Sequence, residues 1–154
     1  MTALRLVTRM VFGDVAVPAG RPLTRRERAR LVVEIVVSYV QLLWLLRRED
    51  LPTMVARARR SRTAVPLPLG DDVALPYAVA RLGRAADRVI GVLPKDGRCL
   101  ITSLVVIRIL ARRSVDAKVV IGVRNEDGFE AHAWVEYDGR AVLPPGDYHR
   151  LVEV

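Results

Sequence analysis

One cysteine and two histidines are the residues of this 154-residue chain best suited to nucleophilic chemistry. Cys99 follows a glycine-containing stretch, residues 91–98, and opens a strongly apolar run that extends to Arg113. We expect a helix there, and the unpaired N–H groups and the dipole at a helix start stabilise an anion. The position therefore favours a thiolate, and the same N–H groups could hold an oxyanion. The alternative is that a lone cysteine in an apolar helix is only a small buried hydrophobic residue.

The first histidine, His132, lies in a predicted strand over residues 129–137. Alternation along a strand places on one face the side chains of Glu130, His132, Trp134 and Glu136. An imidazole beside a thiol accepts its proton and returns that proton to the leaving group, which is what thiol catalysis requires. The alternative is an ordinary half-exposed strand histidine. Trp134 could bind substrate, although a strand tryptophan more often packs in the sheet.

The first two thirds of the chain favour helices. Thr24 and Glu27 stand three residues apart before an apolar run, which is the pattern of a capping box. The predicted helices cover residues 24–48, 50–60, 75–90 and 99–113, and the proline-containing stretch 61–75 is predicted to be a loop. The last helix is apolar nearly all round, so we expect it to be the central buried helix.

The last third favours strands. The predicted strands cover residues 117–124, 129–137 and 140–143, with 148–154 along the sheet edge. Asp138-Gly139 is a strong hairpin signal between the second and third strands. We therefore predict an α+β fold, in which a helical N-terminal region (1–74) and a core (75–154) form one structural domain.

Composition and charge exclude several classes of protein. A single cysteine cannot form an internal disulfide, and one cysteine with two histidines cannot build a closed zinc site of cysteine and histidine ligands. We expect no metal and no cofactor. The net charge of +8 attracts polyanions, but aromatic residues make up only 5% and no nucleic-acid-binding motif appears. We therefore expect no nucleic-acid partner. No secretory signal is recognisable, so the expected compartment is the cytoplasm.

The most apolar segment, residues 31–46, is shorter than the roughly 20 residues of a membrane span, and it contains Glu34 and Gln41. We expect it to form a buried core helix. Peripheral contact with a membrane is the alternative, because arginines flank the segment at both ends.

Several short strings of the sequence resemble the transglutaminase-like cysteine peptidases of lasso-peptide biosynthesis. These are stand-alone leader peptidases, similar to the C-terminal domain of the microcin-processing lasso B protein. The resemblance covers about residues 75–143, and its most specific string is the AHAWVE of residues 131–136 followed by Asp138-Gly139. It also includes Gly97-Arg98-Cys99-Leu100, Ser103-Leu104 and the AKVVIG of residues 117–122.

The resemblance implies a papain-like site on a transglutaminase-like α+β fold, with Cys99 as nucleophile and His132 as general base and acid. The third member in the family is an aspartate on the strand after the histidine, but this chain has Val142-Leu143-Pro144-Pro145 there. The nearest substitute is Asp147. If Tyr137 pairs with Arg140 across a two-residue loop, His132 lies opposite position 145, and Asp147 becomes its diagonal neighbour on the same face.

The function implied by the resemblance is removal of the leader from a ribosomally made lasso-peptide precursor before a separate cyclase closes the ring. The implied partners are the precursor peptide, a small leader-recognition protein and the lasso cyclase. Two other classes stay open. One is a binding or scaffold protein that keeps the fold without the chemistry, and the other is a basic protein that binds nucleic acid or a membrane surface.

Overall fold

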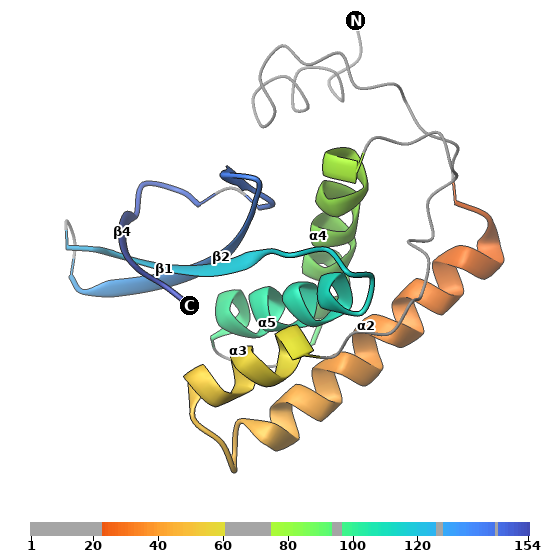
Figure 1. Ribbon diagram of the computed structural model, residues 1–154, viewed down its shortest axis with the longest axis horizontal. Helices are drawn as coiled ribbons and strands as arrows, with labels where there is room; N and C mark the ends of the chain where they lie inside the picture. Colours follow the sequence, from red (N-terminus) through yellow and green to blue (C-terminus); the bar gives the residue numbers. More distant parts are fainter. Residues whose placement is uncertain (1–22, 61–74, 94–96, 126–127, 144) are drawn as a thin grey trace, which may run out of the picture.

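The computed structural model describes residues 23–60, 75–93, 97–125, 128–143 and 145–154. The helices in chain order are α2 (Arg25–Leu45), α3 (Leu51–Arg60), α4 (Leu75–Gly91) and α5 (Arg98–Ala111). The strands are β1 (Lys118–Arg124), β2 (Glu130–Tyr137), β3 (Arg140–Ala141) and β4 (His149–Glu153). They form one four-stranded antiparallel sheet of order β3-β2-β1-β4, which lies over the helices (Figure 1). The predicted α+β fold is confirmed, and of the predicted loop at 61–75 all but Leu75 lies outside the described residues.

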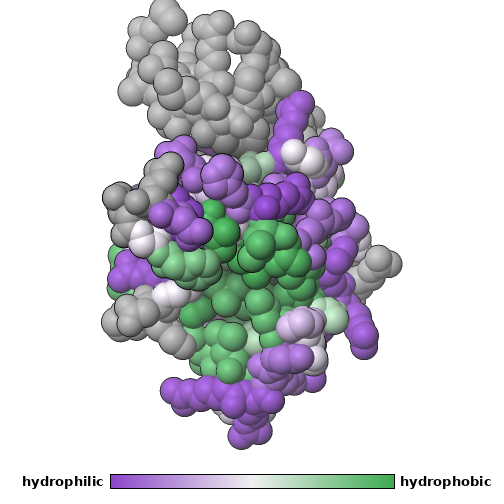
Figure 2. Space-filling view, turned by 90° about the vertical axis from the view of Figure 1, so that its left-hand side faces the viewer, coloured by the Kyte–Doolittle hydropathy of each residue, from purple (hydrophilic) through white to green (hydrophobic). Residues whose placement is uncertain are grey.

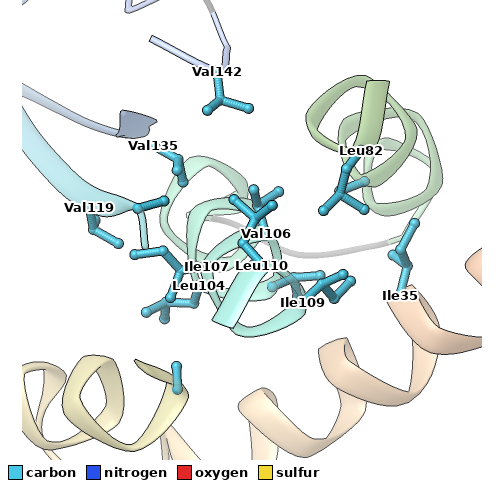
Figure 3. Packing of buried hydrophobic residues seen from close by; sticks show 14 of the residues in the cluster. Ile35, Leu82, Leu104, Val106, Ile107, Ile109, Leu110, Val119, Val135 and Val142 are labelled. Carbon is cyan, nitrogen blue, oxygen red and sulfur yellow. The ribbon is translucent and has the colours of Figure 1, made fainter. Parts of the chain in front are cut away.

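Helix α5 occupies the centre of the molecule, as its sequence predicted. From Ile101 to Ala111 every residue of the helix is buried except Arg108, which is partly exposed. Helices α2, α3 and α4 and strands β1 and β2 all contact it. Seen along its axis, α5 directs Leu104 and Ile107 toward the sheet and α3, whereas Ile109 lies on the side of α2 (Figure 3). A helix with apolar residues all round is stable only when neighbours cover it on every side.

Helix α2 begins with the predicted capping box. The Thr24 hydroxyl accepts a hydrogen bond from the Glu27 N–H (3.3 Å), and the Glu27 carboxylate accepts one from the Thr24 N–H (2.7 Å). The face of α2 that packs on α4 and α5 carries Leu31, Ile35, Tyr39 and Leu42. Its opposite face is exposed, so the expectation of a fully buried helix was wrong for that face. The reason is that α4 and α5 cover only one side of α2.

No helix in the described ranges is both long enough and apolar enough to cross a membrane.

An ion pair fastens α2 to the C-terminal end of α5. Both carboxylate oxygens of Glu34 accept hydrogen bonds from the Arg113 guanidinium, at 2.9 and 2.6 Å. Arg113 also donates to the main-chain oxygen of Ile109 (2.9 Å), and its side chain is only 3% exposed. A guanidinium this deeply buried needs its carboxylate partner, because an unpaired charge is costly away from water.

The sheet follows the predicted hairpin register. Tyr137 pairs with Arg140 across Asp138 and Gly139, which both adopt a positive φ as a tight hairpin turn requires. Strand β3 ends at Ala141, two residues earlier than predicted, and Pro144 and Pro145 lack the N–H groups that would continue the ladder. The chain then crosses to the opposite edge, where β4 pairs with β1. The edge position predicted for residues 148–154 is thereby confirmed for β4.

Replacing Glu34 by Gln should destabilise the protein by about 3 kcal/mol, because it leaves the buried Arg113 without its counter-charge. The matched control is Glu49→Gln, which removes an ion pair to Arg57, whose side chain is 58% exposed. This control should cost less than about 1 kcal/mol. Chemical denaturation of both variants measures the difference, and equal losses would contradict the role given to the Glu34–Arg113 pair.

Candidate active site

Cys99 lies in the first turn of α5 and is a free, partly exposed cysteine. The N-cap is Gly97, which has a φ of 70°, and no side chain in the described chain caps this helix start. Arg98 donates a hydrogen bond to the main-chain oxygen of Gly91 (3.1 Å), which ties the helix start to the end of α4. The first N–H groups of α5 therefore keep their capacity to stabilise an anion near the thiol.

His132 lies on β2, the strand that packs most closely on α5, and pairs with Gly122 of β1. Val135 and Tyr137 of β2 contribute to the core around α5, so by alternation His132 belongs to the other face of the strand. Its ring stacks on the ring of Tyr148, with centroids 4.9 Å apart and planes 25° apart. Burial lowers the pKa of His132 below its ordinary value of 6.5, so the imidazole is neutral at pH 7 and able to accept a proton.

Tyr148 links the histidine to a charged pair at the end of the hairpin. Its hydroxyl donates to the Glu130 carboxylate (3.0 Å), which also accepts a hydrogen bond from Arg124 (2.6 Å). The Arg124 guanidinium lies 5.0 Å from the centre of the Tyr148 ring. The pKa of Tyr148 is raised chiefly by its hydrogen bond to Glu130, next by burial, and then by the negative charge of Glu130. Tyr148 thus connects the imidazole of His132 to the Arg124–Glu130 pair.

The thiol of Cys99 and the imidazole of His132 are not hydrogen-bonded to each other in the described part of the chain. Helix α5 packs against the Val135 face of β2, and the imidazole lies on the alternate face beside Tyr148. Cys99 and His132 therefore lie on two elements that pack against each other, but the two side chains do not form a hydrogen-bonded pair. Catalytic hydrogen bonds commonly tighten only when substrate binds.

Asp147 does not take the position expected for it. The β2–β3 ladder ends at Glu136 and Ala141, followed by one further bond from the Val142 N–H to the Val135 oxygen (2.7 Å). Strand pairing therefore never reaches position 145, and the predicted diagonal contact between His132 and Asp147 was wrong. Asp147 is exposed in the segment before β4, and it forms no hydrogen bond or ion pair with any described residue.

Trp134 is a packing residue in this structure. It is 3% exposed, and its indole N–H donates to the Glu136 carboxylate (2.9 Å). Its ring lies over Gly122, where an added Cβ atom would come within 2.8 Å of the indole. So little of the Trp134 side chain is exposed that almost none of it can contact a substrate. The residue packs on the β1–β2 face instead of taking the predicted substrate-binding role.

Sequence reasoning did not single out Tyr148 or the pair of Arg124 and Glu130. The pair follows from the hairpin register, which places these two residues directly opposite each other. Tyr148 could not be found in this way, because it reaches His132 only through the connection that crosses from β3 to β4 (Figure 1). That connection passes on the side of the sheet away from α5.

The described residues contain no group of three or more His, Cys, Asp or Glu side chains that could hold a metal ion.

Replacing Tyr148 by Ala should raise the pKa of His132 toward 6.5, because the stacked ring that helps to bury the imidazole is lost. Tyr148→Phe keeps the ring and removes only the hydroxyl, so it should leave the pKa of His132 close to that of the wild type. NMR titration of the His132 ring in the three proteins measures this. An unchanged pKa in Tyr148→Ala would contradict the assigned stacking.

Comparison with known proteins gives one match. The profile of the Transglutaminase-like superfamily matches residues 36–154, which include α3, α4, α5, the sheet and the C-terminal part of α2. No curated protein and no solved structure matches the chain. The match spans well over half of the sequence and contains Cys99 and His132 on the two elements described above, so the chain belongs to the transglutaminase-like superfamily.

Proposed function

We propose that this protein is a cysteine peptidase that removes the leader from a ribosomally made lasso-peptide precursor. The observation that carries the proposal is the placement of a single, partly exposed cysteine at the uncapped start of a central helix that packs on the strand of His132. The transglutaminase-like superfamily includes cysteine peptidases. The finer assignment to leader removal rests on the resemblance of the AHAWVE string and its flanking motifs to the lasso-peptide leader peptidases.

The proposed reaction divides peptide hydrolysis into two steps. His132 takes the proton of Cys99, and the thiolate attacks the carbonyl carbon at the end of the leader. The peptide C–N bond breaks, the new amine takes the proton from His132, and the leader stays bound to Cys99 as a thioester. Water, deprotonated by His132, then attacks the thioester carbonyl. The C–S bond breaks, the leader leaves with a free carboxylate, and the sulfur of Cys99 takes the proton back from His132. The first N–H groups of α5 stabilise the oxyanion in both steps.

The proposal requires the thiol and the imidazole to approach each other when the precursor binds. Their surroundings allow a neutral imidazole to act as base, since burial already lowers the pKa of His132. No acid orients the imidazole in the described residues, so we expect slower proton transfer than in a complete triad.

The surface near the free end of the sheet suits an apolar peptide. Phe129 at the hairpin end and Leu151 and Val152 on β4 are all exposed. Viewed from that side, the molecule has a broad hydrophobic area bordered by hydrophilic residues (Figure 2). We infer that the precursor lies across this end of the molecule, delivered by a small leader-recognition protein, and that the lasso cyclase takes up the released core peptide.

Replacing Cys99 by Ala should abolish leader release, because the thiol is the proposed nucleophile. Replacing His132 by Ala should slow release by about 100-fold or more, since general base and acid catalysis is lost. The experiment incubates the full chain with its precursor and the leader-recognition protein and follows both products by mass spectrometry.

The matched control is His149→Ala, which removes the other histidine of the chain from the exposed strand β4. It should release the leader at the wild-type rate. Full activity of Cys99→Ala, or equal losses in the two histidine variants, would contradict the mechanism.

A second candidate function is a catalytically inactive binding or scaffold protein in peptide maturation. It is favoured, within the described residues, by the absence of a hydrogen bond between Cys99 and His132 and of an acid beside the imidazole. Because the chain has a single cysteine, iodoacetamide labelling at neutral pH reports on Cys99 alone. Binding of the precursor without cleavage, together with the slow labelling of an ordinary thiol, would support this candidate over the peptidase.

A further inference from the structure

Helix α2 presents an apolar face to the outside of the molecule. This outward face carries Val33, Val36, Val37, Val40 and Trp44, with Val32 at its margin. Val33 is 61% exposed, Val40 57% and Trp44 53%. Residues 33, 37, 40 and 44 follow one another at intervals of three or four, so their side chains lie on one face of the helix. Figure 1 places α2 along the outer border of the molecule, with α4 and α5 on its inner side only. A continuous exposed apolar face of about three turns indicates contact with another apolar surface.

The exposed charged side chains of residues 25–48 all carry a positive charge. Exposed arginines stand at its start (Arg25, Arg26 and Arg30) and just after its end (Arg47 and Arg48). The two acidic residues of α2 are engaged elsewhere, Glu27 in the capping box and Glu34 with Arg113. The outward face therefore combines an uncharged apolar centre with cations at both ends, which is complementary to an anionic surface with an apolar interior.

Trp44 marks one end of the apolar centre. The Arg48 guanidinium lies over the indole at 4.0 Å from its centroid. Tryptophan and arginine side chains each combine an apolar body with a polar or charged tip, and both are favoured where hydrocarbon meets a charged headgroup layer.

We propose that the outward face of α2 docks on an anionic lipid surface, with its valines in the acyl boundary and its arginines among the headgroups. A second copy of this chain fits less well, because an antiparallel pair of α2 helices would set the arginines at the two ends against each other. An acidic protein fits the charges, but from Val33 to Val40 the centre of the face consists of valines, and specific protein interfaces carry about one hydrogen bond per 100–200 Å². A bilayer interior requires none.

The test measures binding of the full chain to vesicles of mixed phosphatidylglycerol and phosphatidylcholine, by co-sedimentation and by tryptophan fluorescence. The chain has two tryptophans, and Trp134 is buried, so a change in emission on binding reports on Trp44. We expect binding with a blue shift, weakened at least about tenfold when salt rises from about 50 to about 500 mM. Trp44→Phe should still bind the vesicles but lose most of the blue shift.

The variant Val36→Asp with Val40→Asp should weaken vesicle binding by at least about tenfold, because it sets two anions in the apolar centre. Both positions are exposed, so the fold should tolerate the change, which circular dichroism verifies. The matched control, Val92→Asp, replaces an 82% exposed valine outside α2 and should bind as the wild type does.

Three outcomes would overturn the proposal. The first is no binding to anionic vesicles, or equal binding to vesicles of phosphatidylcholine alone. The second is unchanged binding of the double aspartate variant. The third is a dimer in analytical ultracentrifugation that this variant dissociates, which would make the outward face a contact between copies. None of these measurements depends on peptidase activity, so the proposal stands or fails separately from the proposed function.

Discussion

Helix α5 is hydrophobic on every side, so it is stable only where other elements cover it all round. Three helices and two strands do so, and each fully buried leucine or isoleucine contributes about 1.5–3 kcal/mol relative to exposure. This burial fixes where α2, α3, α4 and the sheet lie. It also determines the surroundings of the two ends of α5. At its C-terminal end the buried Arg113 requires Glu34 of α2 as a partner, and at its N-terminal end Cys99 reaches the surface of the core.

The same constraint explains why Cys99 and His132 lie on elements that pack against each other. Within the described residues no side chain caps the N–H groups at the start of α5, which leaves them available to a negative charge at or near the thiol. Strand β2 packs along α5 and carries His132 at the level of the hairpin end, where Tyr148, Glu130 and Arg124 join it. Tyr148 is held by the Glu130 carboxylate and stacks on the imidazole. A ring stack restrains the plane of the imidazole, but unlike a carboxylate it does not fix which nitrogen carries the proton.

Helix α2 differs from α5 in how much of its apolar surface is buried. Both of its faces are apolar, but the core covers only one of them, and the arginines at its ends keep the exposed face positively charged. The net charge of +8 is therefore unevenly distributed along the chain. Part of it borders the apolar outward face of α2.

The sequence by itself determined the elements, the α+β class and the central place of α5, because these follow from local patterns: the Thr24–Glu27 capping box, apolar spacing and the Asp138-Gly139 turn. It also placed Cys99 at a helix start and His132 on a strand face with Trp134. Only the tertiary structure decided what surrounds them. The prolines after β3 end the ladder, the chain crosses the sheet, and Tyr148 rather than Asp147 meets His132. Contacts made by a long crossing connection depend on where the whole chain packs, and local sequence patterns do not encode that position.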